Sequence, residues 1–447
     1  MRVKPFVLVA LALGCSSSTP AGAPDGAVGS DAGSDAASSP DAPSSPDAPS
    51  ASDAPSVAPY DAGAAPECAR AAVFRRVAAR GAGVRDLAVG GLVPYRGGFV
   101  VAVHEAAPRL AGDAGMVRRD TVSVVSVDHD AQVQRPLQLV YASAPEQTDL
   151  TVPALLPLGG GALLTFGESR GAPGLAGSIL RLRGSVLDTG AVPGVPASLL
   201  DEHGEAASTS LPDGRALLLA SRVRGGGGDA GFLVVSPTTY RVDLEGRVSF
   251  GQDLSSFVRL DSESPLLRPA PDGAVLFARV GTDLVQLGFT ADGSVDLRGA
   301  RRTAAFGARR LDDAAVLGDT SVVAWGGTEE GMAVVRAAVV RRDGEVIARR
   351  ELDRYAGDEP TVAVAPAFGG AAVAWLRGAG DTITVRAVTL QPDGVVRGAP
   401  RDLVRAPNAG GRLHLVVGAG ARVATFAAQD VDGLGEQGVS VGRACLP

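Results

Sequence analysis

The chain repeats a segment of its own sequence at an offset of 50 residues. The segment VVAWGGTEEGMAVVRAAVVRRDGEV, which begins at Val322, aligns with AVAWLRGAGDTITVRAVTLQPDGVV further along the chain. Trp325 matches Trp375, and the Asp-Gly pair at 343–344 matches the pair at 393–394. Each copy consists of strand-like apolar runs separated by glycine-containing turns, so the repeated unit is predicted to be built from β-hairpins.

The first hairpin of this unit recurs seven times. Each occurrence has a short apolar run, a glycine-type turn and a second run that is apolar almost throughout. Such a second run is typical of a strand covered on both faces. The seven hairpins lie at 93–103, 156–166, 211–220, 270–278, 316–325, 366–375 and 416–426.

A second hairpin, with a turn of its own, follows most of these. Asp-Gly between two strand-like runs is the strongest short hairpin signal, because glycine adopts a positive φ without a steric penalty. The predicted second turns lie at 128–131, 183–185, 244–247, 291–294, 341–345 and 391–395.

Two hairpins per unit make a four-stranded sheet, and units with a mean length of about 54 residues suit the blades of a propeller. We therefore expect an all-β protein in which residues 68–447 form a β-propeller, with seven four-stranded blades. Six or eight blades are the alternatives in number. A pair of β-sandwiches or a β-solenoid are the alternatives in architecture, and four strands per unit disfavour the solenoid.

The two ends of this region complete each other. The last unit, from about Leu413, has three strand-like runs, whereas the run CARAAVFRRVAAR at 68–80 precedes the first unit without a partner. We expect this run to be the outer strand of the last blade. Cys68 and Cys445 would then meet where the other blades have their second turn. A disulfide bond between them is predicted, since such bonds persist in exported proteins; two free thiols are the alternative.

The N-terminus has the features of an export signal. The sequence MRVKPFVLVALALGC has a basic opening, an apolar run at 6–13 that is too short to span a bilayer, and a small residue before Cys15. Its end, ALGC, resembles the signal of bacterial lipoproteins, although Ala12 and Leu13 stand in the reverse of the usual order. The resemblance implies that Cys15 is lipidated on sulfur and that the chain is cut before it. An ordinary secretory signal with an incidental cysteine is the alternative.

Residues 16–67 are predicted to be a disordered tether. They hold eight acidic residues, no Lys or Arg, one aromatic residue and three Asp-Ala-Pro units. Such a composition buries too little apolar surface to offset the entropy lost on ordering. The expected organisation is a signal peptide at 1–14, the lipidated cysteine and tether at 15–67, and the propeller at 68–447. The protein is expected in the cell envelope as an outer-membrane lipoprotein that faces either the periplasm or the surface.

The charge balance disfavours nucleic acid as a partner. The signal carries two basic residues and the tether eight acidic ones, so the formal net charge of −7 leaves about −1 for residues 68–447. The sequence therefore predicts the membrane as a partner, through the lipid anchor, and predicts no nucleic acid.

Motifs that carry chemistry are weak in this sequence. GESRG at 167–171 matches the G-x-S-x-G pattern of a nucleophile elbow, but the APGLAG that follows cannot begin the helix that such a site needs after Ser169. DVDGLGE at 430–436 offers three carboxylates but lacks the spacing of a calcium loop. The four histidines are scattered. We therefore predict no catalytic residue, no metal site and no cofactor.

The predicted connections between second and third strands vary in length, and in an up-and-down blade they all emerge on one face. Long variable loops on a rigid scaffold commonly carry binding sites. The longest are predicted at 105–120, 168–177, 222–231 and 430–438. The candidate binding residues are Arg109, Arg118, Arg119, Arg170, Arg222, Arg224, Asp430, Asp432 and Glu436.

The function that the sequence favours is that of a membrane-anchored lipoprotein whose propeller binds or scaffolds a protein or glycan partner on this face, without enzymatic activity. A glycan-acting or other hydrolytic propeller enzyme is one alternative, but it requires carboxylates near the central channel, where the inner strands are poor in Asp and Glu. A role similar to that of the propeller lipoprotein of the outer-membrane barrel-assembly machinery is another. The Ala-x-Asp…Gly…Trp pattern of that family's blades is absent.

Overall fold

The computed structural model describes a large part of the chain between Val73 and Leu446. The described ranges are 73–79, 86–106, 120–143, 148–170, 179–187, 196–201, 203–224, 234–255, 265–304, 306–379, 382–407, 410–417, 423–431 and 436–446. All of them belong to the second of two compact units, Ala62–Pro447. The predicted signal peptide, Cys15, the tether and Cys68 lie outside the described residues, so the predictions for them stay open.

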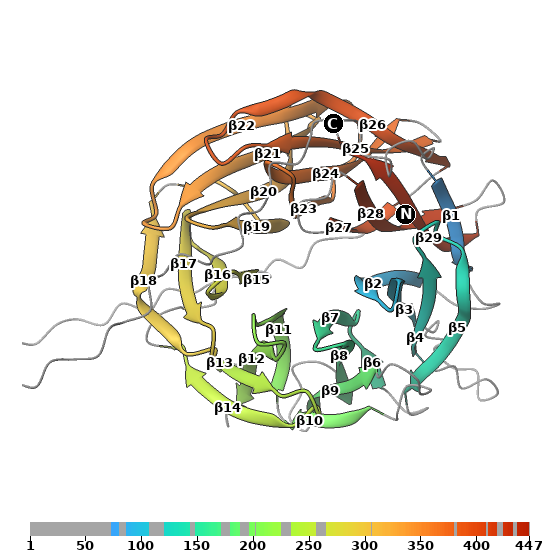
Figure 1. Cartoon of the computed structure of the whole chain (residues 1–447), viewed down its shortest axis with the longest axis vertical. Coiled ribbons are helices and arrows are strands. Elements are labelled where there is room, and N and C mark those ends of the chain that lie inside the picture. The colour runs from blue at the N-terminus through green and yellow to red at the C-terminus, as the bar shows by residue number, and fades with distance from the viewer. Residues whose placement is uncertain are drawn as a thin grey trace, which may run out of the picture. The chain divides into compact units, whose positions relative to one another are not determined.

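The described residues form seven antiparallel sheets around one axis, which confirms the seven-bladed β-propeller (Figure 1). Blade 1 consists of β2 (Asp86–Tyr95), β3 (Gly98–Ala106), β4 (Thr121–Asp128) and β5 (Val133–Ala142). Blade 2 consists of β7 (Ala154–Leu158), β8 (Gly161–Arg170), β9 (Ile179–Leu187) and β10 (Ala197–Asp201), and the short β6 (Thr148–Leu150) also pairs with β8. Blade 3 consists of β11 (His203–Ser210), β12 (Ala216–Arg224), β13 (Val234–Val242) and β14 (Val248–Asp253).

The remaining four blades follow the same plan. Blade 4 consists of β15 (Leu266–Ala270), β16 (Gly273–Val280), β17 (Asp283–Thr290) and β18 (Val295–Thr303). Blade 5 consists of β19 (Asp313–Leu317), β20 (Thr320–Glu329), β21 (Met332–Arg341) and β22 (Val346–Tyr355). Blade 6 consists of β23 (Val362–Ala367), β24 (Gly370–Ala379), β25 (Thr382–Leu390) and β26 (Val396–Pro407). Blade 7 consists of β27 (Gly410–Val417), β28 (Val423–Val431), β29 (Gln437–Cys445) and β1 (Val73–Ala79).

Blade 7 closes the ring with strands from both ends of the propeller sequence. β1 is the outermost strand and pairs antiparallel with β29, with Val73 opposite Arg443 and Ala79 opposite Gly438. The predicted closing strand within 68–80 is therefore confirmed. Its side chains are mostly half-buried, because Val73, Val77 and Ala78 pack into the cluster shared with blade 1 and Phe74 packs into the cluster shared with blade 6.

The hairpin predictions hold with one exception. All seven first hairpins are present, and five of the six predicted second turns join a third strand to a fourth. The predicted turn at 183–185 is wrong, because these residues lie inside β9. Gly184 pairs with Ala197 of β10, and an added Cβ there would lie 2.4 Å from the Leu199 side chain. This glycine allows the Leu199 side chain to approach the backbone closely and does not form a turn.

Proline occurs at an equivalent position in several of the innermost strands. Four of them have a proline that pairs with the residue five positions later: Pro94, Pro157, Pro269 and Pro366. Proline has no N–H to donate and is confined to edge strands within sheets. The other edge of each innermost strand faces the axis of the ring and has no neighbouring strand. The sheet therefore loses no hydrogen bond where proline lacks an N–H.

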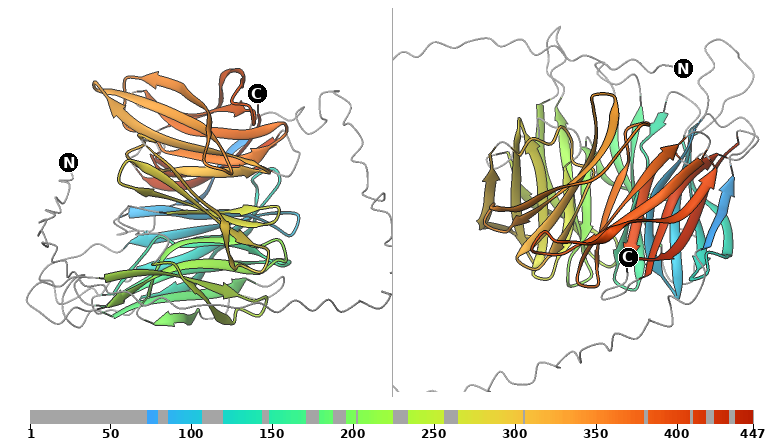
Figure 2. Two further views of the ribbon diagram at one scale, coloured as in Figure 1. Left: turned by 90° about the vertical axis from the view of Figure 1, so that its left-hand side faces the viewer. Right: turned by 90° about the horizontal axis from the view of Figure 1, so that it is seen from above.

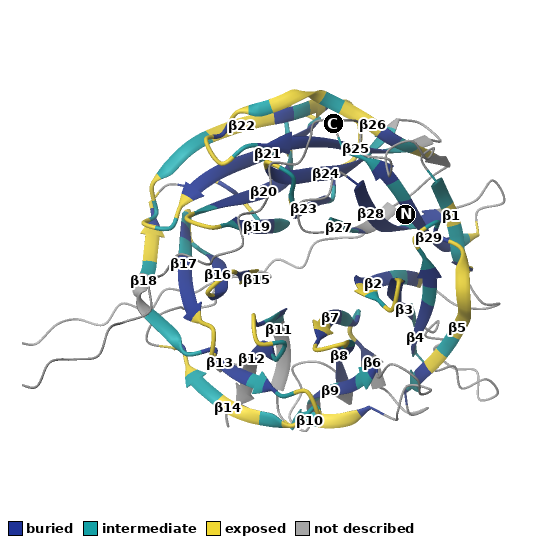
Figure 3. Cartoon of the chain, viewed as in Figure 1, coloured by how far each residue is buried: buried dark blue, intermediate teal, exposed yellow. Residues whose placement is uncertain are grey.

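The hydrophobic core lies between adjacent blades. Figure 3 shows the second and third strands as largely buried and the outer strands as largely exposed. Trp375 is fully buried against Val335 and Leu352 of blade 5. Trp325 packs with its ring centre 5.2 Å from that of Phe306, which precedes blade 5. Both tryptophans therefore pack between neighbouring sheets, and each such burial contributes about 1.5–3 kcal/mol.

The Asp-Gly turns also join the blades. The carbonyl of Gly344, in the second turn of blade 5, accepts a hydrogen bond from the Thr303 hydroxyl of blade 4 at 2.8 Å. The carbonyl of Gly394, at the matching position of blade 6, accepts one from Nε of Arg350 of blade 5 at 2.9 Å.

Figure 2 shows the strands crossing the ring between two faces. We call the face with the hairpin turns the turn face, and the face where second strands lead into third strands the loop face.

Candidate functional site

The connections on the loop face divide the ring into two arcs. In blades 4, 5 and 6 the second strand leads to the third through two residues, as at 281–282, 330–331 and 380–381. In blades 7, 1, 2 and 3, which are consecutive around the ring, the connection is longer, from five residues in blade 7 to fourteen in blade 1. The long connections that the sequence predicted therefore belong to one continuous arc.

Most of the predicted binding residues belong to these long connections. Outside the described residues lie Arg109, Arg118, Arg119 and Asp432. The backbone alone is described for Arg170 at the end of β8, and for Arg222 and Arg224 at the end of β12. The structure brings these three positions to the loop-face ends of second strands in blades 2 and 3, and their role in binding stays a prediction.

Asp430 has a different place from the one expected, whereas Glu436 is an exposed residue of the connection between β28 and β29, as predicted. Asp430 is not in a loop: it lies in β28, is 6% exposed, and forms an ion pair with Arg76 of β1 at 3.0 Å. It also accepts a hydrogen bond from the Ser440 hydroxyl of β29. The backbone carbonyl of Glu436 accepts a bond from the same arginine at 3.1 Å. These contacts bind the closing strand to blade 7, so the Asp430 carboxylate is engaged in ring closure.

A polar cluster that sequence reasoning missed lies at the loop-face end of the interface between blades 1 and 2. Glu168 of β8 is 1% exposed. One of its carboxylate oxygens accepts a hydrogen bond from the Tyr141 hydroxyl at 2.8 Å, and the other accepts one from Nε of Arg183 at 2.5 Å. The Arg183 guanidinium also lies over the Tyr141 ring, 4.9 Å from its centre. Because Tyr141 belongs to blade 1, this cluster joins the two blades.

His104 and Asp120 extend the cluster on the side of blade 1. His104 is 7% exposed, and its Nε2 lies 3.8 Å from Asp120 Oδ2 and has no hydrogen-bond partner among the described residues. The N–H of Leu150 donates to the same Asp120 oxygen at 3.2 Å, and Leu150 pairs with Glu168 in blade 2. A histidine, a tyrosine, an arginine and two carboxylates are therefore gathered here. Groups of these kinds can bind a polar ligand or transfer protons.

Part of this cluster recurs in other blades. In three blades the sixth residue of the second strand is aromatic and pairs across the sheet with an arginine of the third strand: Phe166 with Arg183, Trp325 with Arg336, and Trp375 with Arg386. Arg386 reaches Asp353 of the preceding blade at 3.1 Å, as Arg183 reaches Tyr141. The aromatic–arginine pair in blades 2 and 6 therefore fastens each blade to the one before it. Phe166 occupies the same repeat position as Trp325 and Trp375. Aligning these three positions in the sequence could have revealed the aromatic–arginine pair of blade 2.

A second carboxylate group lies on the loop face beside blade 5. Nε of Arg310 lies 2.6 Å from one oxygen of Asp312, whose other oxygen accepts the N–H of Gly326 at 2.7 Å. Arg310 also forms an ion pair with Glu359 at 2.9 Å. Burial raises the pKa of the Asp312 carboxyl, and the nearby Arg310 charge opposes that rise. The group links the segment before β19 to the connection between blades 5 and 6.

The two motifs of the sequence do not form reactive sites in the described residues. Ser169 lies inside β8, where it pairs with Leu180, and not on the strand-to-helix turn that a nucleophile elbow requires. Within the described ranges, no three His, Cys, Asp or Glu side chains are grouped so that they could hold a metal ion. Nor does that part of the chain contain an apolar helix long enough to cross a bilayer.

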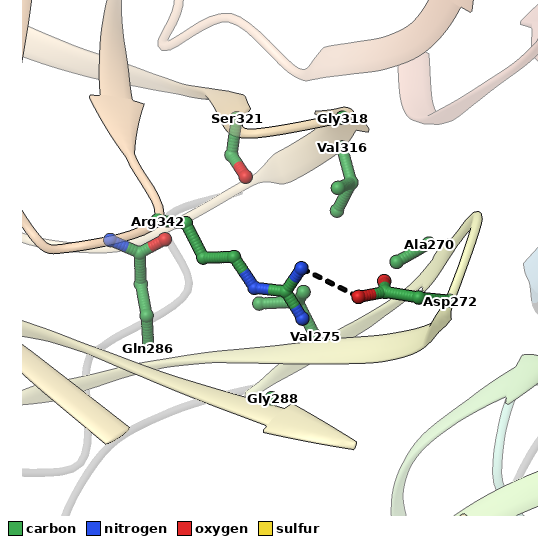
Figure 4. Close-up of a pocket in the computed structure, with 9 residues that line it drawn as sticks. All are labelled: Ala270, Asp272, Val275, Gln286, Gly288, Val316, Gly318, Ser321 and Arg342. Atoms are coloured by element: carbon green, nitrogen blue, oxygen red, sulfur yellow. Dashed lines mark hydrogen bonds and ion pairs between the residues drawn. The ribbon is translucent and has the colours of Figure 1, made fainter. Parts of the chain in front are cut away.

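A small pocket opens on the turn face between blades 4 and 5 (Figure 4). Arg342, from the turn between β21 and β22, reaches into it, and its Nη1 lies 2.6 Å from Asp272 Oδ2. Val275 supplies an apolar wall, and Gln286 and Ser321 supply polar ones. Because Arg342 and Asp272 neutralise each other across the blade boundary, the pocket serves as a contact between blades.

The fold places the chain in the class of seven-bladed β-propellers with four-stranded blades. No protein-family model matches the chain, and no curated protein matches its sequence. A solved structure of an ulvan lyase, a polysaccharide lyase bound to a GlcA(1-4)Rha3S unit, aligns with a TM-score of 0.51 and 10% identity over 82% of this chain and 94% of the lyase. A protein of unknown function from Dyadobacter fermentans aligns with a TM-score of 0.45 and 13% identity over 84% of this chain and 99% of that one. At its identity, the likeness to the lyase concerns the fold.

Proposed function

We propose that the protein is an envelope lipoprotein whose propeller binds a partner on the loop face, over the arc of blades 7, 1, 2 and 3. The observation that carries this proposal is the placement of the long connections on four consecutive blades, whereas blades 4, 5 and 6 have two-residue connections. Longer connections cost more closure entropy and add little to the stability of a blade. Loops held by a rigid scaffold are common carriers of binding residues.

The state of the described carboxylates on this arc supports binding over catalysis. Glu168 is occupied by Tyr141 and Arg183, and Asp430 is occupied by Arg76 and Ser440. These side chains hold blades and strands together, so the variable loops can change without loss of the scaffold.

A loop exchange tests the binding site. The connection at 171–178 is replaced by the Glu-Gly pair that serves blade 5 at 330–331, and the same exchange is made at 225–233. Chemical crosslinking in intact membranes, followed by capture of the protein, should recover a partner with the unaltered chain and lose it with the shortened chains. A matched control replaces Glu330-Gly331 by Asp-Gly in blade 5 and should keep the partner. Retention of the partner by both shortened chains would place the site elsewhere.

The membrane anchor is the second half of this proposal. The export-type segment that ends at Cys15 and the acidic tether that follows support it. Cys15→Ser should abolish labelling by a radioactive or clickable fatty acid and move the protein to the soluble fraction. Membrane retention of Cys15→Ser without acyl labelling would exclude lipidation as the anchor.

A glycan-acting enzyme is the second candidate. The observation in its favour is the buried His104 of the blade 1–2 cluster, whose Nε2 has no hydrogen-bond partner among the described residues. His104, Asp120, Tyr141, Glu168 and Arg183 are side chains of the kinds that act as general acids, general bases and charge-stabilising cations. The fold likeness to a polysaccharide lyase is consistent with this alternative. Incubation with a panel of uronate polysaccharides should then yield an unsaturated sugar product that absorbs ultraviolet light, and Tyr141→Phe and His104→Gln should each reduce it. Absence of product across the panel would remove this candidate.

A further inference from the structure

Three arginines occupy the same register position on the outer strands of blades 4, 5 and 6. Counted from the first residue of each second strand, the fifth residue pairs with a residue of the third strand, which in turn pairs with the arginine. The three chains of pairing are Phe277–Gln286–Arg301, Ala324–Ala337–Arg350 and Ala374–Ala387–Arg401. In blades 1 and 2 the same position holds Gln138 and Ala197.

These three arginines are exposed, and none of them has a carboxylate partner among the described residues. Arg301 donates to the carbonyl of its neighbour Ala300 at 2.8 Å, and Arg350 donates to the Gly394 carbonyl at 2.9 Å. Such bonds to backbone oxygens orient a guanidinium and leave its charge uncompensated. They also leave donors of the guanidinium fork free for another ligand.

The surrounding outer strands add to this positive charge. We call the exposed arginines of β18, β22 and β26 the arginine arc: Arg301, Arg302, Arg349, Arg350, Arg354, Arg397, Arg401 and Arg405. The exposed acids described on the same three strands are Glu351 and Asp402. On the outer strands of blades 1, 2 and 3, by contrast, the one exposed arginine described is Arg135. Arg302, Arg354 and Arg405 form ion pairs with Asp283, Glu351 and Asp402. Exposed arginines still outnumber exposed acids on these three strands, although residues 68–447 are nearly neutral as a whole.

We propose that the arginine arc binds an extended anionic polysaccharide whose sugars carry sulfate or carboxylate groups. A guanidinium binds such oxyanions through two parallel hydrogen bonds, which lysine does not match. Because the three equivalent arginines sit on three different blades, a small anion can contact one of them, whereas a polymer can contact all. The proposal rests on the export half of the proposed function, since such polymers are encountered outside the cytoplasm. It is independent of the loop-face site.

Other polyanionic partners fit this surface less well. Single-stranded nucleic acid is held by exposed aromatic side chains on which bases stack. The one exposed large aromatic among the described residues is Phe250, which lies on β14 of blade 3. An anionic lipid surface is bound best where apolar side chains stand beside the basic ones. On the rim the exposed large apolar residues lie mainly on blade 1, at Val133, Leu137 and Leu139.

Binding of defined polymers to the purified full-length chain tests the proposal. The probes are dextran sulfate and polygalacturonate, with uncharged dextran as the reference. The arc variant is Arg301→Gln, Arg350→Gln and Arg401→Gln together. The matched control is Arg75→Gln, Arg135→Gln and Arg247→Gln together, which removes the same charge from exposed positions outside the arc. Thermal unfolding of both variants checks that they keep the fold.

The unaltered chain should bind at least one anionic polymer and bind it more weakly as salt rises. The arc variant should bind roughly tenfold more weakly or worse, and the control variant should stay within about threefold, since the first loses contacts and the second only distant charge. A variant with lysine at the three arc positions keeps the charge without the fork and should fall between the two. The comparison of arginine with lysine at these positions tests the proposal even if the glutamine variant is unstable.

Several results would overturn the proposal. Equal loss in the arc and control variants would mean that only net charge matters. Tighter binding to single-stranded DNA or to vesicles with anionic lipid than to both polysaccharides would assign the surface to another partner. No binding to either polysaccharide would leave the arc without this function. The measurement is made in solution, so a failure of the lipid anchor or of the loop-face site leaves its result unchanged.

Discussion

Arg76 and Asp430 lie 354 positions apart in the chain and form an ion pair of 3.0 Å at the joint that closes the ring. Arg76 comes from β1, the first strand of the propeller, and Asp430 comes from β28. The Asp430 carboxylate is largely buried, and Ser440 of the intervening strand β29 also donates to it. One side chain thus ties together three strands drawn from the two ends of the sequence.

Replacement of this carboxylate should weaken the closing blade. Asp430→Asn keeps the size of the side chain but leaves Arg76 without its counter-charge in a partly buried setting, so the free energy of unfolding should fall by about 1–3 kcal/mol. Hydrogen exchange should rise first in 73–79 and 437–445, because β1 is held to the ring through β29. Arg75→Gln, on the exposed neighbour, should change stability by less than about 0.5 kcal/mol. A uniform rise of exchange in all blades would contradict the role of this pair.

The predicted disulfide bond between Cys68 and Cys445 concerns the same joint. Cys445 ends β29, and Cys68 precedes β1, which pairs with β29. Mass spectrometry of unreduced peptides from the exported protein should find the two cysteines joined. Reduction, or Cys445→Ser, should lower the melting temperature. Closing so long a loop can add up to about 5 kcal/mol to the free energy of unfolding. Recovery of both residues as free thiols would leave closure to strand pairing and to the Arg76–Asp430 pair.

The glycine of the second turn in blade 6 should tolerate no side chain. Gly394 has φ of +81°, and an added Cβ would lie 2.1 Å from Cβ of Ala348 in blade 5. Gly281 has φ of +61° with open space around it, so Gly281→Ala reports the backbone strain alone, which costs about 1–2 kcal/mol. Gly394→Ala should lose at least about 1 kcal/mol more, measured by denaturant unfolding. Equal losses would show that this turn does not fasten blade 6 to blade 5.

Tyr355 should make the protein sensitive to alkaline pH. Burial, and next the charge of nearby Asp353, raise the pKa of its hydroxyl from 10.0 to about 12. In the unfolded chain this tyrosine ionises at the lower value, so its stabilising contribution is complete below pH 10 and is lost as the pH rises towards 12. The hydroxyl also donates to the Leu376 carbonyl at 3.1 Å.

Tyr355→Phe separates this effect from general alkaline unfolding. At neutral pH the variant should be less stable by about 1 kcal/mol, the contribution of the lost hydrogen bond. The gap between the two proteins should narrow from pH 10 to pH 12, because the variant has no hydroxyl to ionise there. Unfolding by denaturant at a series of pH values measures the gap, and Tyr95→Phe, at the first turn of blade 1, serves as the control. A gap that stays constant with pH would contradict the raised pKa.

Sequence reasoning reached the number of blades because each blade repeats a local pattern. Turn chemistry and apolar runs act over a few residues, so the first hairpins and the Asp-Gly turns could be found without knowledge of the fold. The error at Gly184 has the same origin. A glycine that accommodates the Leu199 side chain looks like a turn in sequence, and only the register of β9 and β10 separates the two cases.

The candidate site was much less predictable. The sequence located the long connections of the loop face, but it placed Asp430 among loop residues because the pairing of Asp430 with Arg76 depends on ring closure. The cluster of Tyr141, Glu168 and Arg183 was missed because its members come from two blades that meet only when the ring forms. The equivalence of Arg301, Arg350 and Arg401 was likewise hidden by β-bulges, which shift the spacing between repeats.

The sequence by itself determined the seven hairpin repeats, the four-stranded unit and the strand that closes the last blade, since these follow from apolar alternation, glycine turns and one unmatched run at each end. The tertiary structure alone decided which carboxylates are engaged between blades and which outer-rim arginines lack a carboxylate partner in the described part of the chain. The physical reason is that burial and ion pairing between blades depend on the angle and register at which neighbouring sheets meet. Those quantities arise from the packing of the whole ring, and no local stretch of sequence encodes them.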